Sequence, residues 1–255
     1  MRAAIAVAAA AVMLAIALAV MAPAALLDAR IAALSGGRMR IANATGTFWN
    51  GSGELVLLPA GTRRPLSWRL DAWPLLRGDI RGVVAGDGES GQEATIAYAS
   101  DRFELRGLDV SLPAEGLLRV VTSAKAPLAV GGNLLLHIDH LLQAPDALDA
   151  QLTLQWRDAS VPAPRADARI ALGDVRLDLG GRGAELSGPI VNTGGDVEIS
   201  GQVAVAAAGG SKLDATVRPR GTDRARTETI AAALSALGTS DGQGGYRVSW
   251  SGTWR

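Results

Sequence analysis

The first strong pattern in the chain is an unbroken apolar run over residues 3–22. Every position in it is Ala, Val, Ile, Leu or Met, and Arg2 is the only charged side chain before it. Twenty residues in a helix rise about 30 Å, which matches the hydrocarbon thickness of a bilayer. The run therefore predicts a membrane-spanning signal anchor over residues 1–25. A cleavable secretory signal is the alternative, because Ala22-Pro23-Ala24 resembles a cleavage site, although the apolar core of such signals is usually shorter.

A short stalk is expected after the anchor, over residues 26–40. Leu26, Leu27 and Ile31 continue a helical pattern, and Ser35-Gly36-Gly37 is expected to end it, because paired glycines terminate helices. Arginines are more numerous after the apolar run than before it, so the positive-inside rule gives little support to a cytoplasmic N-terminus. Long domains translocate largely regardless of charge, and we expect the body to lie outside the cytoplasmic membrane.

Beyond residue 40 the apolar positions follow a period of two. In Pro65–Asp71, Leu66, Trp68 and Leu70 alternate with polar residues, as in a half-buried strand. The same alternation predicts further strands at 103–106, 108–112, 134–139, 152–157, 175–179, 197–205, 212–217 and 246–250.

Glycine-rich breaks separate these runs, and we expect turns there: Gly86-Asp87-Gly88, Gly131-Gly132, Gly180-Gly181 and Gly194-Gly195. Short strands with regular breaks are typical of antiparallel sheets, and helices do not alternate with the strands as in α/β proteins. The fold is therefore expected to be mainly β: one large antiparallel domain over residues 41–255, either a curled sheet or a sandwich.

One helix is expected near residues 223–237. Thr222 or Asp223 can cap its N-terminus, and the face formed by Ile230, Ala233, Leu234 and Leu237 is apolar. Gly238 stands where a C-cap is expected.

Composition narrows the chemistry. The chain has no cysteine, which excludes disulfides, thiolate metal sites and a cysteine nucleophile. Its 25 basic and 25 acidic residues balance, so nothing favours a nucleic-acid partner.

The segment His137-Ile138-Asp139-His140 is the one cluster of metal-ligand residue types. On a regular strand His137 and Asp139 share a face and His140 points the other way, whereas zinc needs three or four convergent ligands. No serine nucleophile motif occurs either. We therefore predict no catalytic residues, no metal and no cofactor.

Tryptophans gather near both ends of the body. Trp49, Trp68 and Trp73 fall in one stretch, and Trp250 and Trp254 lie at the end of the chain. Tryptophan more often anchors a core than binds a ligand, but it is also enriched at interfaces, so both interpretations stay open.

The segment Ala44–Gly53, which reads A-T-G-T-F-W-N-G-S-G, resembles the G-T-x-W-x-G motif of the type II secretion system protein N family. Leu66–Leu70, Trp73–Gly78 and the end of the chain from Arg218 to Val248 resemble that family's later motifs. The residues that carry the likeness, and that are candidates for an interface, are Gly46, Thr47, Trp49, Gly51, Trp68, Trp73 and Gly78. We expect Gly46 and Gly51 to flank a short aromatic strand, where glycine permits a tight turn or a close backbone approach.

The resemblance implies a single-pass inner-membrane protein with a periplasmic body. It implies an accessory role in exporting folded proteins across the outer membrane, contacts with other secretion-system subunits, and no enzymatic activity. The alternative is an anchored β-sheet protein that binds lipid or another apolar ligand along an open sheet face. A periplasmic hydrolase is a third hypothesis, which would need a polar pocket that no motif predicts.

Overall fold

The computed structural model describes residues 21–58, 61–71, 74, 78–86, 93–99, 101–115, 130–145, 147–163, 168–207, 209–221 and 223–253. All but the last two residues of the predicted membrane-spanning run lie outside these ranges. Within the ranges, no helix has the length and apolar character needed to cross a membrane.

The described residues form one antiparallel sheet of fourteen strands, which confirms the expected mainly-β fold. The strands are β1 (Met39–Gly46), β2 (Asn50–Leu57), β3 (Thr62–Leu70), β4 (Ile80–Gly86), β5 (Glu93–Ala99), β6 (Arg102–Pro113), β7 (Gly131–Ala144), β8 (Ala147–Pro162), β9 (Arg169–Gly183), β10 (Glu185–Thr193), β11 (Val197–Ala206), β12 (Gly210–Pro219), β13 (Thr239–Ser240) and β14 (Tyr246–Thr253).

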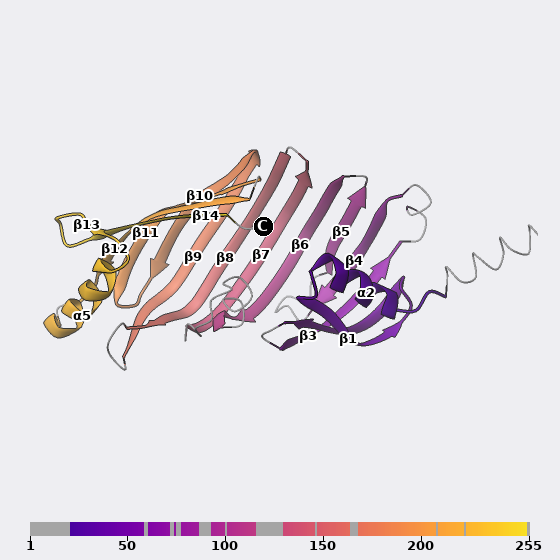
Figure 1. Cartoon of the computed structure of the whole chain (residues 1–255), viewed down its shortest axis with the longest axis horizontal. Helices are drawn as coiled ribbons and strands as arrows, with labels where there is room; N and C mark the ends of the chain where they lie inside the picture. Colours follow the sequence, from indigo (N-terminus) through magenta and orange to yellow (C-terminus); the bar gives the residue numbers. More distant parts are fainter. Residues whose placement is uncertain are drawn as a thin grey trace, which may run out of the picture.

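The sheet is open, and its strand order follows the chain from β1 to β12 before ending β14–β13 (Figure 1). Of the two architectures left open by the sequence, a single sheet is therefore the one observed. From β1 to β12 each strand pairs with its neighbours in sequence, so contacts along this part of the sheet are made between adjacent hairpins, and β12 then pairs with β14.

The two faces of the sheet differ in polarity, as the period of two predicts. In β3, Trp68 and Leu70 are buried while Ser67 and Arg69 are exposed. Residues paired directly across strands share a face, and the pairs Leu112–Leu134, Leu136–Leu154 and Leu152–Leu179 extend the apolar face across the middle of the sheet.

The predicted C-terminal helix is confirmed as α5 (Arg224–Ser235). The Asp223 side chain accepts hydrogen bonds from the backbone N–H groups of Ala225 and Arg226, as an N-cap does. Leu237 lies beyond the end of the helix and is 68% exposed, so it does not join the apolar face assigned to it.

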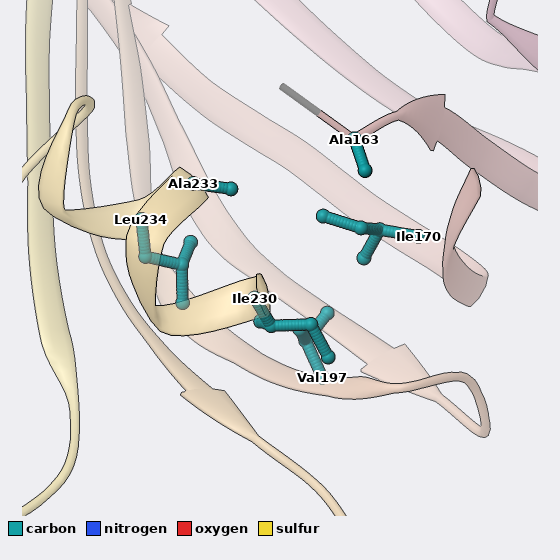
Figure 2. Packing of buried hydrophobic residues seen from close by; sticks show 6 residues of the cluster. All are labelled: Ala163, Ile170, Val197, Ile230, Ala233 and Leu234. Carbon is teal, nitrogen blue, oxygen red and sulfur yellow. The ribbon is translucent and has the colours of Figure 1, made fainter. Parts of the chain in front are cut away.

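Helix α5 covers the apolar face at one end of the sheet (Figure 1). Ile230, Ala233 and Leu234 of the helix point toward Val197 of β11 and Ile170 of β9 (Figure 2). Ile230 and Val197 are each 1% exposed and are the largest side chains among the described residues that are so fully buried.

Helix α2 (Ala25–Leu34) covers the other end; it begins at the last residue of the expected anchor and continues into the segment expected as a stalk. It ends at Ser35 as predicted, and Gly36 and Gly37 follow with φ of +60° and +79°. Its residues Leu27 and Ile31 pack against a buried cluster that includes residues of β1 and β3. The part of the chain that follows the predicted anchor is therefore packed on the sheet.

The glycine breaks have different outcomes. Gly194-Gly195 forms the predicted turn between β10 and β11, with φ of +74° and +75°. Gly131-Gly132 lies at the start of β7, and Gly86 ends β4, while residues 87 and 88 lie outside the described ranges.

The break expected at Gly180-Gly181 is wrong, because β9 runs through it to Gly183. Gly180 pairs with Gln151 of β8 on one side and with Ser187 of β10 on the other. A Cβ atom at Gly180 would lie 2.3 Å from the Gln151 Oε1 atom, so the missing side chain makes room for a neighbour rather than for a turn.

The orientation expected for His140 is also wrong. The pairing of β7 with β8 shifts by one residue between Ile138 and His140, so Asp139 is an extra residue on β7. Ile138 and Leu141 consequently share the apolar face, which leaves His137 and His140 together on the polar face.

Candidate functional site

The family-like motif forms the turn between β1 and β2. β1 ends at Gly46 and β2 begins at Asn50, so the short aromatic strand expected between the motif glycines is not present. The Thr47 N–H donates to the Asn50 carbonyl (2.9 Å), and the Asn50 N–H donates to Thr47 Oγ1 (3.1 Å). These reciprocal bonds close the turn, and Gly46 enters it with a φ of +87° that favours glycine.

Trp68 of β3 lies beneath this turn and is 3% exposed. Its indole N–H points at two carbonyl oxygens of the turn, those of Phe48 (3.1 Å) and Thr47 (3.3 Å). Gly51 is paired directly opposite Trp68, and a Cβ atom there would lie 2.5 Å from the indole ring. The absence of a side chain at Gly51 therefore leaves the space that the indole ring of Trp68 occupies.

The same turn holds described residues at the end of the predicted anchor, which was expected over residues 1–25. The Phe48 N–H donates to the Ala22 carbonyl (2.7 Å), and the Ala24 N–H donates to the Gly46 carbonyl (3.3 Å). Pro23 forms a β-bridge with Thr47, and Ala24 is 2% exposed. Residues 22–24 are thus fixed to the sheet by the backbone of the motif.

Trp49 packs against the buried cluster that contains Trp68. Its ring stands edge-on to Phe48, with centroids 5.1 Å apart, and its carbonyl accepts from the Leu70 N–H (2.6 Å). We call the assembly of residues 22–24, 46–51 and Trp68 the anchor node.

Two candidate residues do not join the anchor node. Gly78 lies between β3 and β4 with a φ of +82°, and no heavy atom would come within 4 Å of an added Cβ. Trp73 lies outside the described residues.

The candidate list missed Asp28 of α2, which closes the outer edge of β1. Its carboxylate accepts from the Ile41 N–H (2.7 Å) and from the Arg40 guanidinium Nη2 (2.7 Å). The hydrogen bond from Arg40, and to a lesser degree that from Ile41, lowers the pKa of Asp28 below its usual range. The available signal was that Asp28 is the one acidic residue of this helix, in which Arg30 is the only other charged residue.

The histidines contact acidic side chains across the polar face. His137 Nδ1 lies 2.6 Å from Asp109 Oδ1, a hydrogen bond that raises the pKa of His137. Asp149 accepts from Arg182 Nε (2.8 Å) and lies 3.1 Å from His140 Nε2. Across the described ranges, no three His, Asp or Glu side chains are grouped as a metal site.

Residues 37–249 match the family described as Type II secretion system (T2SS), protein N. The chain belongs to the type II secretion system protein N family. The match includes β1 to β13 and the first half of β14, so it covers nearly the whole sheet rather than the motif alone. Neither a curated protein nor a solved structure matches the chain. Family membership indicates an accessory component of type II secretion. In this chain the motif residues from Gly46 to Gly51, together with Trp68, build the anchor node.

Proposed function

We propose that this protein is a non-catalytic inner-membrane subunit of the type II secretion system, and that it supports the export of folded proteins across the outer membrane. Residues 3–22 span the inner membrane once, the sheet stands in the periplasm, and its surfaces contact other secretion-system subunits. The observation that carries the proposal is the family match over residues 37–249.

The anchor node supplies the mechanism. Residues 22–24 are bonded to the motif turn, so the described chain is held to the sheet from Ala22 onward. We propose that this attachment limits the orientations of the sheet relative to the membrane, and thereby decides which surfaces other subunits reach.

A structural use of the histidines is consistent with this role. His137, His140 and their acidic partners lie on adjacent strands and contact one another, an arrangement that stabilises strand pairing.

Export of a type II cargo tests the proposal. Deletion of the gene is expected to lower the amount of cargo in the medium, and the intact chain on a plasmid is expected to restore it. A Gly51→Leu variant, which removes the space for Trp68, is expected to complement poorly. The matched control is Gly86→Leu, at an exposed position without a positive φ, where an added Cβ would meet only the Pro65 carbonyl oxygen at 3.8 Å. Unchanged export in the deletion strain would contradict the proposal.

Topology needs its own measurement. In spheroplasts, added protease is expected to digest the body, and a cytoplasmic marker is expected to stay intact. Protection of the body until the inner membrane is lysed would overturn the periplasmic placement.

One observation favours a second candidate function, the binding of an apolar ligand. A hollow of about 480 Å³ is lined by Phe103, Leu141 and Leu148 of β6–β8 and by Leu186 and Val205 of β10–β11. These strands are not all neighbours in the sheet, so the hollow follows the curvature of its apolar face. Native mass spectrometry of the full chain distinguishes the two functions, because bound lipid favours the ligand carrier and its absence favours the subunit.

A further inference from the structure

The polar face of the sheet is hollowed over strands β3 to β6. The hollow has a volume of about 440 Å³, and the side chains that line it form two rows across the four strands. The first row is Arg69, Val83, Thr95 and Arg106, and the second is Asp71, Arg81, Ala97 and Glu104. Each row joins residues that lie directly opposite one another on neighbouring strands, so all of these side chains stand on one face.

The centre of the hollow is formed by short side chains and its ends by long cationic ones. Val83, Thr95 and Ala97 occupy the middle positions of the two rows. Arg69 and Arg81 are diagonal neighbours on β3 and β4, and such neighbours lie about 7–8 Å apart in an antiparallel pair. Two guanidinium groups at this spacing can bind one anion from two sides.

Two of the arginines have no acidic partner. Within the described ranges, Arg106 pairs with Glu104 of its own strand, whereas Arg69 and Arg81 are exposed and make no ion pair. Asp71 lies opposite Arg81, but the bond between them joins backbone atoms (2.8 Å). Three guanidinium groups thus face two carboxylates, which leaves one excess positive charge. Because guanidinium binds phosphate through paired N–H groups, the hollow suits an anion with one negative charge.

The hollow borders the anchor node. The Leu70 N–H, on the β3 side of the hollow, donates to the Trp49 carbonyl (2.6 Å), and the Phe48 N–H donates to the Ala22 carbonyl (2.7 Å). Ala22 is the last residue of the apolar run over residues 3–22. Under the proposed function, on which this inference rests, that run lies in the membrane. The phosphates of membrane lipids are then the anions nearest to the hollow.

We propose that the hollow binds the headgroup of an anionic phospholipid, with Arg69 and Arg81 as the ligands of its phosphate. Phosphatidylglycerol has the matching charge, because its phosphate is ionised and its headgroup has no amine. Phosphatidylcholine carries a compensating cation, which leaves the excess positive charge of the hollow unbalanced. Binding attaches the polar face of β3–β6 to the membrane surface, in addition to the attachment at the anchor node.

Lipid retention by the full chain tests the site. The chain is reconstituted in nanodiscs that contain phosphatidylcholine and phosphatidylglycerol, and native mass spectrometry identifies the lipids that stay bound on release. The wild type is expected to retain phosphatidylglycerol in preference. Arg69→Gln together with Arg81→Gln is expected to lower its retention about 25-fold, since each basic residue near a membrane surface strengthens binding about fivefold.

Arg63→Gln is the matched control. Arg63 is an exposed residue of the same strand and face, and it lies about 20 Å from Arg69 at the rise of an extended strand. Two further surface changes, Arg218→Gln and Arg247→Gln, remove as many charges from the far end of the sheet as the double variant removes from the hollow. Both controls are expected to retain phosphatidylglycerol as the wild type does.

A second measurement does not depend on the arginine variants. A photo-crosslinking diazirine amino acid is placed at Thr95, an exposed position in the centre of the hollow. Irradiation of intact cells is expected to give the purified chain an added mass equal to that of phosphatidylglycerol. A crosslink to a protein instead would show that the hollow binds an acidic segment of a partner, and would overturn the proposal.

The proposal also fails if the wild type retains both lipids equally, or if the controls lose phosphatidylglycerol as strongly as the double variant. Displacement of the lipid by added inorganic phosphate would identify a site for the free anion rather than for a headgroup. A chain that stays outside the nanodisc would contradict the membrane placement in the proposed function as well. A chain that enters the nanodisc without preferring phosphatidylglycerol would contradict the lipid site alone.

Discussion

Replacing Trp68 by alanine is expected to open the anchor node. The side chain is 3% exposed, and a tryptophan buries about 150–250 Å², which at about 25 cal/mol per Å² corresponds to about 4–6 kcal/mol. Measured tryptophan-to-alanine changes in cores cost about 3–5 kcal/mol. We therefore expect Trp68→Ala to lower the free energy of unfolding by about 4 kcal/mol, a large share of the stability of a typical domain.

The damage is expected to be local. Strands pair with their neighbours in sequence, so loss of the indole affects β1–β3 and residues 22–24 before it affects the α5 end. Hydrogen exchange of the full chain in detergent is expected to quicken over residues 22–57 and to stay unchanged over residues 197–250. Urea titration followed by circular dichroism gives the free energy.

Two further variants keep this prediction testable if Trp68→Ala fails to fold. Trp68→Phe retains most of the buried ring but removes the N–H that the turn carbonyls accept, and we expect a cost of about 1–2 kcal/mol with the same local pattern. Trp156→Phe removes a comparable bond to the Gly131 carbonyl (2.9 Å) and is expected to leave residues 22–57 protected. A cost below about 1 kcal/mol for Trp68→Ala, or an equal loss of protection along the whole sheet, would refute the reasoning.

Three other changes test the contacts that hold the sheet. Gly46→Ala is expected to cost more in urea titration than Gly78→Ala, since both glycines have positive φ but only at Gly46 would the new Cβ lie 2.5 Å from a carbonyl oxygen; equal costs would contradict the steric argument. Folding lowers the pKa of Asp28, chiefly through the hydrogen bond from the Arg40 guanidinium of β1. The ionised Asp28 carboxylate therefore stabilises the folded state fully above pH about 4, and this stabilisation is lost as the pH falls from the usual pKa of 3.8 through the folded pKa. The stability difference between the wild type and Asp28→Asn should accordingly shrink in urea titrations below pH 4, and a difference that grew there would contradict this sign. Asp196→Asn weakens the bonds from Arg226 and is expected to quicken hydrogen exchange in α5 but not in α2, whereas an unchanged α5 would show that apolar packing alone holds it.

The sequence predicted the parts of the fold that depend on local pattern. Alternation of Leu66, Trp68 and Leu70 with polar residues is enough to place β3, because one face of that strand is buried and the other exposed. Asp223 and the spacing of Ile230 and Leu234 were likewise enough to place α5. In both cases the signal lies within one element.

Features that depend on a neighbouring strand were not predictable. From the sequence, Gly180 predicts a break between strands. In the structure, the Gln151 side chain of β8 occupies the position that a Gly180 side chain would take. The face of His140 follows from a one-residue bulge, which no period of two reveals. Strand β10 was missed because Gly188 and Pro189 interrupt its apolar pattern.

The candidate site was found by motif, but its role required the structure. The motif residues come together as a turn around the indole of Trp68, and the motif alone does not predict this contact. The residues are Gly46, Thr47, Trp49, Gly51 and Trp68. The turn contacts residues 22–24 through backbone atoms. Because almost any residue can make a backbone hydrogen bond, the amino-acid sequence does not predict this contact.

The central claim, that this protein contacts other secretion-system subunits, is tested most directly by chemical crosslinking in intact cells. The protein is then purified, and mass spectrometry identifies the proteins crosslinked to it. We predict that inner-membrane and periplasmic subunits of the type II secretion system are recovered with the intact chain and are depleted with Gly51→Leu. Recovery of no secretion-system subunit, from cells that express the chain at its natural level and secrete cargo normally, would contradict the account.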